Sequence, residues 1–180
     1  TGESGSGKST LVQLLTGYMT PSSGEILIND KFNLNQLNIN KFRNKISYLT
    51  QDCVIFNASL KENITWFDKS ISDAKVKDTL RLLKLDYFIK RMNDPLNMIL
   101  NDINSNISGG EKQRIAIARL LLQDTELILL DEITSSLDKE NSYLIYSIMK
   151  KISKSKIVVA ISHDPIWINS NAKKTNLIKI

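Results

Sequence analysis

The sequence predicts one α/β domain whose core is a mostly parallel sheet flanked by helices. Short β-type runs alternate with helical segments along the 180 residues, without repeats or low-complexity tracts. The runs at 127–130 and 157–161 are continuously apolar, as parallel strands buried on both faces require. The chain is long enough for one such domain, and its 42% of hydrophobic residues suffices for a core.

Local signals place the first elements of this domain. Lys8 should begin a helix that ends near Gly17, because glycine is the usual residue just beyond a helix. Residues 21–24, Pro-Ser-Ser-Gly, predict a turn, and the alternating residues 25–29 predict the strand that follows it. Residues 46–50 predict another strand.

The middle of the chain is predicted to be helical. Between residues 72 and 92, four apolar residues recur near the helical period: Val76, Leu80, Leu83 and Phe88. We therefore expect a helical subdomain, covering approximately residues 53–118, inserted into the α/β core. Residues 139–152 lie between the two apolar runs and should form a crossover helix, and residues 176–180 should add one further strand.

Composition narrows the classes of function. The net charge of +5 comes mostly from scattered lysines, without the arginine-rich stripe or interleaved aromatics typical of nucleic-acid-binding proteins. A solvated basic surface is the simpler interpretation, and attraction to nucleotides or to an anionic membrane surface is the alternative. The longest apolar runs fall far short of the roughly 20 residues that cross a bilayer, and no signal peptide opens the chain.

Two further features concern the context of the chain. Cys53 is the only cysteine, so no intramolecular disulfide can form and a reducing, intracellular compartment is expected. Thr1 is not a methionine, and the chain begins inside the motif described next, with no strand ahead of it. We therefore expect a partial domain that lacks its first strands, and any link to a membrane should go through a partner or a further segment.

The first nine residues contain a phosphate-binding motif. Gly2, Gly7, Lys8 and Ser9 match every fixed position of the P-loop pattern G-x-x-x-x-G-K-[ST]. The glycines let the backbone curl so that successive N–H groups meet phosphate oxygens, and the following helix presents its positive N-terminal end. Lys8 supplies a charge for the β- and γ-phosphates, and the Ser9 hydroxyl suits Mg²⁺. A flexible Gly/Ser turn is the alternative interpretation.

A phosphate-binding loop of this kind needs an acidic partner for the metal. Asp131 and Glu132 follow directly on the apolar run 127–130. Asp131 would hold the water shell of Mg²⁺, and Glu132 would polarise the attacking water as general base. Two acids at the end of an apolar strand are by themselves more often a surface turn or a helix cap, but beside a P-loop the functional interpretation is favoured.

A second helix start precedes these acids. Ser108 and Glu111 stand three residues apart and fit a capping box, so a helix should run from there through Leu121. Gly109 and Gly110 allow close backbone approach, which makes the helix N-terminus a second candidate anion site. Taken in isolation, this pattern more commonly marks only a well-capped helix.

In this order, the P-loop, the segment at 108–111 and the pair Asp131-Glu132 resemble the ATP-binding cassette of ABC-type ATPases. The resemblance covers nearly the whole chain and implies the P-loop NTPase fold, with an inserted helical subdomain that carries the family's signature motif. That motif is normally Leu-Ser-Gly-Gly-Gln, so Ile107 and Glu111 are departures from it.

The resemblance implies further site residues. Gln51 matches the Q-loop glutamine, which contacts Mg²⁺ and water and senses the transmembrane partner. Residues 135–138, Ser-Ser-Leu-Asp, look like the D-loop, with serine where many members carry alanine. His163 matches the switch histidine, which hydrogen-bonds the γ-phosphate and positions Glu132 and water, although a lone histidine is more often structural.

The expected activity is that of a Mg²⁺-dependent ATPase, with ATP and Mg²⁺ as ligands. The expected catalytic residues are Glu132, His163 and Gln51. The expected metal ligands are Ser9, Gln51 and Asp131. The expected ATP-binding residues are Gly2, Ser4, Gly5, Ser6, Gly7, Lys8, Ser9, Thr10, Ser108, Gly109, Gly110 and Asp138.

The resemblance also implies partners. In this family two cassettes pair head to tail, so that each γ-phosphate lies between one P-loop and the signature helix of the other cassette. Phe56 and the Glu-Asn-Ile at 62–64 follow the Q-loop as in the exporter subgroup, which implies a transmembrane domain in the same or a separate chain and a place at the cytoplasmic face of a membrane. Asn101 and Asp102 depart from the Gly-Glu that exporters usually show there. No specific nucleic acid is expected as a partner.

Three classes of function stay open at this point. The first is a transport motor. The second is a soluble ABC ATPase that acts on DNA or ribosomes, but only about a hundred residues separate the P-loop from the signature, without coiled-coil heptads, a second cassette or a charged linker. The third is a regulatory module that holds ATP without turnover. The presence of both Glu132 and His163 argues against this class.

Overall fold

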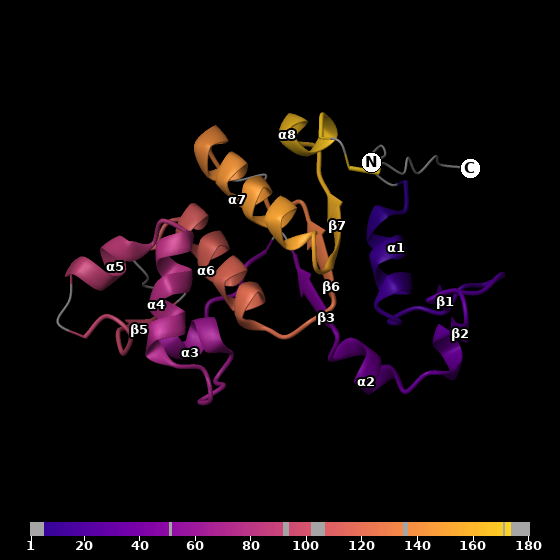
Figure 1. Ribbon diagram of the computed structural model, residues 1–180, viewed down its shortest axis with the longest axis horizontal. Helices are drawn as coiled ribbons and strands as arrows, with labels where there is room; N and C mark the ends of the chain where they lie inside the picture. Colours follow the sequence, from indigo (N-terminus) through magenta and orange to yellow (C-terminus); the bar gives the residue numbers. More distant parts are fainter. Residues whose placement is uncertain are drawn as a thin grey trace.

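The computed structural model describes residues 6–50, 52–91, 94–101, 107–134, 137–170 and 172–173. Among these residues, a parallel three-stranded sheet forms the centre of the fold (Figure 1). Its strands are β3 (Ile46–Leu49), β6 (Leu127–Asp131) and β7 (Ile157–Ile161), with β6 in the middle. The strands predicted at 46–50, 127–130 and 157–161 are therefore confirmed, and with them the α/β fold.

Helices cover the sheet on both faces: α1 (Lys8–Leu15) on one, and α6 (Gly109–Leu122) and α7 (Lys139–Ile152) on the other. Val12 of α1 packs against Leu129. Ile128 and Leu130 belong to the larger core, which includes residues of α6 and α7. Because successive side chains of a strand point to opposite faces, one apolar run supplies both cores. The crossover helix predicted at 139–152 is α7.

The helix α1 begins after one glycine and ends before another. Gly7 precedes it with a φ of 87°, and Gly17 follows it with a φ of 68°. The positive φ at Gly17 favours glycine, and a Cβ atom there would lie 2.4 Å from the Cδ1 atom of Ile39, whose side chain would have to move. The Nη2 atom of Arg43 donates to the Gly17 carbonyl at 2.8 Å, which places a positive charge at the helix C-terminus. The helix predicted from Lys8 to near Gly17 is confirmed.

A hairpin replaces the single strand that was predicted at 25–29. In the structure β1 (Leu27–Ile28) pairs antiparallel with β2 (Phe32–Asn33). Asn29 and Asp30 have φ values of 54° and 55°, a conformation that these two residue types tolerate better than most, and there the chain reverses. The short helices η1 (Leu34–Gln36) and α2 (Ile39–Arg43) then lead to β3.

A cluster of short elements lies beside the sheet, at the left of Figure 1. It consists of β4 (Ala58–Ser59), α3 (Leu60–Thr65), α4 (Asp73–Leu82), α5 (Asp86–Arg91) and β5 (Ile99–Leu100), with β4 and β5 antiparallel. Leu60 of α3 and Leu80 of α4 share one buried core with Ile115 of α6 and Ile128 of β6. Helix α6 therefore joins this cluster to the sheet.

The helical segment predicted at 72–92 is two helices in the structure. The chain turns between Leu83 and Leu85, where Lys84 has a φ of 54°. Both leucines are fully buried. Burying a leucine contributes roughly 1.5–3 kcal/mol, whereas a left-handed residue costs roughly 1–2 kcal/mol, so burial of the pair outweighs the strain at Lys84. No glycine or proline marks this turn, and the sequence therefore did not predict it.

Arg119 ties α6 to the segment that follows β3. Its Nε atom donates to the Asn63 carbonyl at 2.8 Å and its Nη2 atom to the Val54 carbonyl at 3.2 Å. The guanidinium also lies over the rings of Trp66 and Phe56, with its Cζ atom 4.7 and 5.2 Å from their centroids. Only 8% of Arg119 is exposed, so these contacts replace the water that the charge would otherwise keep.

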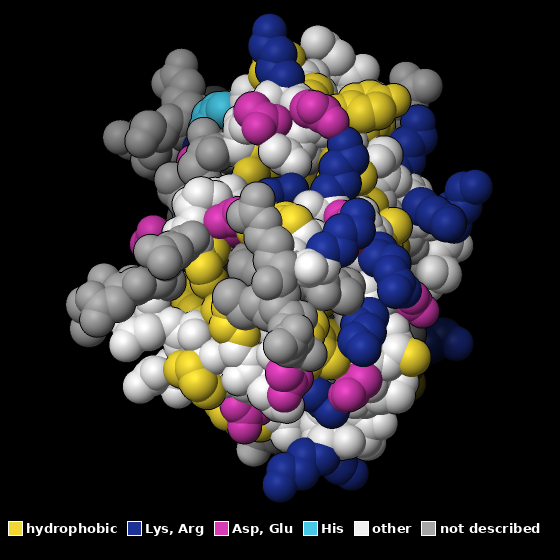
Figure 2. Space-filling view, turned by 90° about the vertical axis from the view of Figure 1, so that its left-hand side faces the viewer, with side chains coloured by type: hydrophobic (Ala, Val, Ile, Leu, Met, Phe, Trp, Pro, Cys, Tyr) yellow, Lys and Arg dark blue, Asp and Glu magenta, His cyan; other side chains and the backbone are white. Residues whose placement is uncertain are grey.

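The surface over α4 and α5 faces the viewer in Figure 2, where Lys and Arg side chains gather in a band along one side and acidic and apolar side chains are interspersed elsewhere. After β7 the described chain continues through α8 (Pro165–Ile168). The strand expected at 176–180 lies outside the described residues. In the part of the chain that is described, no helix combines the length and apolar character needed to cross a bilayer.

Candidate functional site

Two expected catalytic residues meet at the carboxyl edge of the sheet. Because β6 and β7 are parallel neighbours, the residues that follow them emerge at the same edge. The Oε1 atom of Glu132 lies 3.4 Å from the Nε2 atom of His163, and their side chains are 32% and 59% exposed. Glu132 has a φ of 51°, which turns the chain away from β6. Its N–H still donates to the Ile161 carbonyl of β7 at 2.9 Å, so the hydrogen bonding between the two strands extends by one more bond. This turn directs a carboxylate toward an imidazole at a solvent-accessible edge.

Asp131, the last residue of β6, lies beside a tyrosine that the sequence did not single out. The hydroxyl of Tyr48 on β3 donates to the Oδ2 atom of Asp131 at 3.2 Å. Burial, and then the negative charge of Asp131, raises the pKa of Tyr48 to about 12, so this hydroxyl remains a donor at any physiological pH. The register of the two parallel strands was the signal that could have found Tyr48, since it lies opposite Leu129, which is two residues before Asp131 and on the same face of β6.

The N-terminus of α1 lies at this same edge, at the top of Figure 1, where β7 also ends. Lys8 lines a cavity of about 620 Å³ together with Ser162, the residue before His163. Gly7, at the N-cap position, makes no side-chain hydrogen bond to the helix, and the Oγ atom of Ser6 is buried without a hydrogen-bond partner among the described residues. A helix N-terminus without a side-chain cap, beside an unsatisfied hydroxyl, fits an anionic ligand such as phosphate.

The predicted capping box at the start of α6 is confirmed. The N–H of Glu111 donates to the Ser108 hydroxyl at 3.3 Å, and the N–H of Ser108 donates to the Glu111 carboxylate at 2.6 Å. The Tyr87 hydroxyl from α5 donates to the same carboxylate. Burial raises the pKa of Glu111, but the hydrogen bonds from Tyr87 and Ser108 outweigh it and the pKa lies below its ordinary value. Ser108 and Gly109 are exposed at the surface.

Asp138 begins α7 beside this helix start. Its Oδ1 atom accepts from the N–H of Asn141 at 2.8 Å, and its Oδ2 atom accepts from the Asn141 Nδ2 atom at 2.8 Å. These hydrogen bonds lower the pKa of Asp138. The preceding residue, Leu137, lies so close to Gly110 that a Cβ atom on the glycine would be 3.3 Å from the leucine Cδ2 atom. The expected signature and D-loop residues are thus neighbours.

The expected site residues therefore form two clusters. Asp131, Glu132 and His163 meet at the sheet edge near α1, which carries Ser9 and Thr10. Ser108, Gly109, Gly110 and Asp138 meet at the starts of α6 and α7. The expected residues Gly2, Ser4, Gly5 and Gln51, and the D-loop residues Ser135 and Ser136, lie outside the described residues.

The donor set at the sheet edge suits a hard cation that is shared with a phosphate. Within the described residues, no group of three or more His, Cys, Asp or Glu side chains converges as a preformed metal cage. Mg²⁺ does not need such a cage, because it is usually held by one or two carboxylates together with substrate phosphates and water. Asp131 at the end of β6 and the Ser9 hydroxyl on α1 fit that pattern.

Comparison with known proteins identifies the family. The model of the family described as ABC transporter matches residues 1–135. The chain belongs to this family. The cassette fold and the exporter resemblance are confirmed, and the ATP-binding domains of ABC transporters are nucleotide-binding ATPases.

Two curated relatives and one solved structure place the chain more closely within this family. The Heterocyst differentiation ATP-binding protein HepA of Nostoc sp. is 39% identical over 162 residues, which are 90% of this chain and 26% of HepA. The Toxin RTX-III translocation ATP-binding protein of Actinobacillus pleuropneumoniae is 38% identical over 90% of this chain and 23% of its own length. The structure of a bacterial Atm1-family ABC exporter with ATP bound matches with a TM-score of 0.80 and 31% identity, over 90% of this chain and 28% of that one. The chain thus spans about a quarter of the length of these proteins.

Proposed function

We propose that this chain binds and hydrolyses Mg²⁺-ATP as the nucleotide-binding domain of a membrane exporter. The observation that carries the proposal is the approach of Glu132 and His163 to 3.4 Å at the carboxyl edge of a parallel sheet, beside the N-terminus of α1. A half-buried carboxylate paired with an imidazole next to a helix N-terminus is an arrangement for activating water against a phosphate. The export and translocation functions in the names of the relatives favour the transport motor over a nucleic-acid or ribosomal ATPase.

The P-loop is the proposed grip on the triphosphate. Backbone N–H groups at residues 2–10 and the Lys8 ammonium would hold the phosphates, and the buried, unpartnered Ser6 hydroxyl supports a ligand at this bend. Mg²⁺, when bound, neutralises charge on the β- and γ-phosphates, and Ser9, Gln51 and Asp131 are the residues that would hold it. Tyr48 would orient Asp131 through its hydroxyl.

Glu132 is the proposed general base. Its carboxylate takes a proton from water while the water oxygen attacks the γ-phosphorus and the bond to the β–γ bridging oxygen breaks, so that ADP and phosphate leave. His163 holds Glu132 by the contact of 3.4 Å and would donate a hydrogen bond to the γ-phosphate. Gln51 would position the same water.

A second cassette is the proposed partner across the ATP. Ser108, Gly109, Gly110 and Asp138 lie at helix starts, and both oxygens of the one carboxylate among them are held by Asn141. Their proposed role is therefore to close over the γ-phosphate of the opposing cassette, while Glu132 takes the water proton. ATP then supplies the negative charge that lets two positively polarised surfaces meet, and hydrolysis removes that charge. The presence of two helix N-termini suited to anions in one chain, those of α1 and α6, supports this head-to-tail arrangement.

The proposed partner that moves during the ATPase cycle is a transmembrane domain, in the same or a separate chain. This partner would place the cassette at the cytoplasmic face of a membrane. The helical subdomain at approximately 53–118 and the Q-loop would transmit the motion. Thr50 and Asp52, which flank Gln51, line a groove of about 530 Å³ between β3 and α6, and this groove supports a docking contact near the Q-loop. Arg119 lines the opposite side of the same groove.

A nucleotide-binding assay tests the proposal. Purified intact protein should bind ATP and release phosphate, and Lys8→Ala should weaken ATP binding by about a hundredfold, because it removes the charge at the phosphates. Lys154→Ala, at an exposed position after α7, is the matched control and should bind ATP like the unmutated protein. Tight ATP binding without any phosphate release would contradict the ATPase and would instead support a regulatory module.

A further inference from the structure

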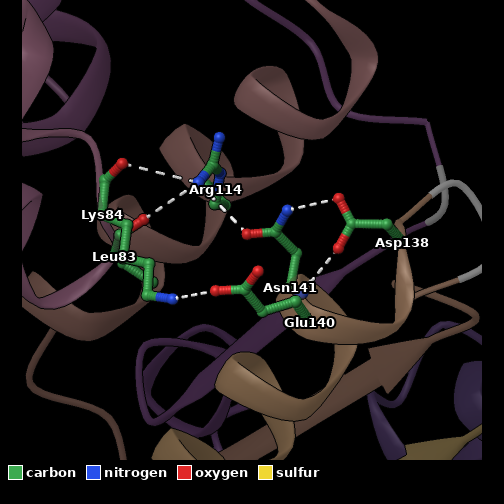
Figure 3. A network of polar contacts seen from close by, with 6 residues as sticks. All are labelled: Leu83, Lys84, Arg114, Asp138, Glu140 and Asn141. Carbon is green, nitrogen blue, oxygen red and sulfur yellow. Dashed lines mark hydrogen bonds and ion pairs between the residues drawn. The ribbon is translucent and has the colours of Figure 1, made fainter.

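A polar network that contains none of the proposed catalytic residues joins three elements (Figure 3). Arg114 of α6 donates from Nη1 to the Oδ1 atom of Asn141 on α7 at 3.2 Å. The same Nη1 atom lies 3.4 and 3.5 Å from the carbonyl oxygens of Leu83 and Lys84, at the turn after α4. The Arg114 Nε atom donates back to the Gly110 carbonyl at 3.3 Å. One side chain therefore contacts the signature glycine, the end of α4 and the start of α7.

Asn141 carries the network on to Asp138. Its Oδ1 atom accepts from Arg114, while its Nδ2 atom and backbone N–H donate to the two separate oxygens of the Asp138 carboxylate at 2.8 Å each. An N-cap residue needs only one such bond to satisfy the helix. The second bond fixes the rotation of the carboxylate, because both of its oxygens are held by one residue.

Packing and charge tie the same elements together. Leu137 contacts Gly110 so closely that an added Cβ atom would lie 3.3 Å from its Cδ2 atom. On the outer side, the Lys84 ammonium pairs with Glu140 of α7 at 2.5 Å. Hydrogen bonds from Tyr87 and Ser108 lower the pKa of Glu111 against the effect of burial, and hydrogen bonds from Asn141 lower that of Asp138; the positive charge of Arg114 adds a smaller contribution in the same direction to both.

We propose that Arg114 and Asn141 are positioning residues that hold the signature glycines and the D-loop Asp138 as one unit. The inference rests on the proposed function, since this unit would meet the ATP of the opposing cassette. Neither residue is proposed to touch the substrate. Arg114 sets the distance between the starts of α6 and α7, and Asn141 sets the orientation of Asp138, so that both helix ends reach the γ-phosphate together.

The test compares turnover with substrate affinity and folding in the intact protein. Arg114→Ala and Asn141→Ala should each lower kcat for phosphate release about tenfold, with KM for ATP changed less than about twofold, because the P-loop grip is untouched. The double variant should lose little more than the worse single variant, as expected for two members of one network. Arg81→Ala is the matched control, because this exposed arginine of α4 pairs with Asp78 and should leave kcat unchanged.

Asn141→Asp separates positioning from stability. An aspartate still accepts from Arg114, but it turns the donor toward Asp138 into a second carboxylate. We expect a melting temperature close to that of the unmutated protein, a kcat lowered about tenfold at pH 8, and partial recovery near pH 6 as the carboxylate pair takes up a proton. A purely structural contact would not produce this pH dependence.

The outcomes separate this inference from the proposed function. Phosphate release by the unmutated protein, with kcat for Arg114→Ala and Asn141→Asp within about twofold of it, would overturn the inference and leave the ATPase intact. Equal losses in Arg81→Ala would also overturn it. If Arg114→Ala failed to fold, Asn141→Asp would decide the matter. Absence of phosphate release from the unmutated protein would overturn both.

Discussion

The sheet edge and the starts of α6 and α7 both present features that suit a phosphate, but they differ in chemistry. The sheet edge carries a carboxylate and an imidazole 3.4 Å apart, Glu132 and His163, beside Asp131. The helix starts carry a hydroxyl, glycine backbone and a carboxylate whose oxygens are both occupied by Asn141. Changes at the sheet edge should therefore damage proton transfer and metal binding. Changes at the helix starts should damage geometry.

The helix starts of α3 and α6 differ in exposure, and this difference makes the start of α6 a candidate site. Ser59 and Glu62 form the same capping box on α3 that Ser108 and Glu111 form on α6. The start of α3, however, is buried: Ser59 is 7% exposed, and Leu60 follows it. At α6 the capping serine is exposed and two glycines follow. The capping box alone therefore satisfies a helix, and only exposure and glycine open it to a ligand.

A substitution at the sheet edge should have the largest effect on kcat. Glu132→Gln should lower kcat for ATP hydrolysis about a thousandfold, because an amide cannot take the water proton, while ATP affinity stays within about threefold. Phosphate release and fluorescent-nucleotide binding measure the two quantities. Glu126→Gln is the matched control, because this exposed carboxylate pairs with Lys45 at 3.1 Å at the opposite end of β6. A kcat for Glu132→Gln within tenfold of the unmutated value would remove Glu132 from the chemistry.

A substitution at the start of α6 should have the next largest effect on kcat. Ser108→Ala should lower kcat about tenfold and the free energy of unfolding by about 1 kcal/mol, because the hydroxyl both caps α6 and faces the proposed ligand. Ser59→Ala removes the equivalent cap of α3 and should cost a similar free energy of unfolding without a change in kcat. Steady-state kinetics and urea unfolding on both variants separate the two roles. Equal kcat losses in both would mean that the cap of α6 is only structural.

A smaller effect, on kcat/KM, is expected from a second substitution near the sheet edge. Tyr48→Phe removes the hydroxyl that donates to Asp131 at 3.2 Å, and we expect kcat/KM to fall about threefold at limiting Mg²⁺, in keeping with the loss of one hydrogen bond. Because the pKa of Tyr48 is about 12, the loss should be the same at pH 6 and pH 9. Tyr143→Phe, an exposed tyrosine of α7, serves as the control. A loss that grew with pH would show that Tyr48 titrates in this range.

The smallest effect concerns the two capping boxes in acid. The lowered pKa of Glu111 means that the folded state binds fewer protons than the unfolded state, so this group stabilises the fold above the unfolded-state pKa and the benefit is lost as pH falls through the folded-state pKa. Glu111→Gln should therefore flatten the loss of stability between about pH 5 and about pH 3, with kcat at neutral pH unchanged within about twofold. Glu62→Gln should act in the same direction on stability. A Glu111→Gln curve as steep as that of the unmutated protein would contradict this account.

The sequence predicted those parts of the fold in which local signals agree with burial. The runs 127–130 and 157–161 became neighbouring parallel strands, and their order along the chain brought Glu132 and His163 to one edge. The capping box at Ser108 is a local pattern of two residues, and it formed as expected. Such features need no knowledge of distant contacts.

The features that escaped prediction depend on contacts between elements. The turn at Lys84 exists because the neighbouring leucines are buried, and no breaker residue marks it. Tyr48 became a partner of Asp131 only through strand pairing. Arg114 and Asn141 lie on different helices, and each alone is an ordinary polar residue on a helix surface. The hairpin after Ile28 did have a local signal, since Asn29 and Asp30 are residues that favour turns.

In the proposed ATP-bound dimer, the P-loop of one cassette and the signature helix of the other close on the same ATP. A disulfide trap tests this most directly: Ser6→Cys and Ser108→Cys are combined with Cys53→Ser and Glu132→Gln in the intact protein, which is then oxidised with ATP, with ADP or without nucleotide. We expect a covalent link between two cassettes that forms rapidly with ATP and at least about tenfold more slowly otherwise. A link that forms equally fast without ATP, or none under any condition while ATP is bound, would contradict it.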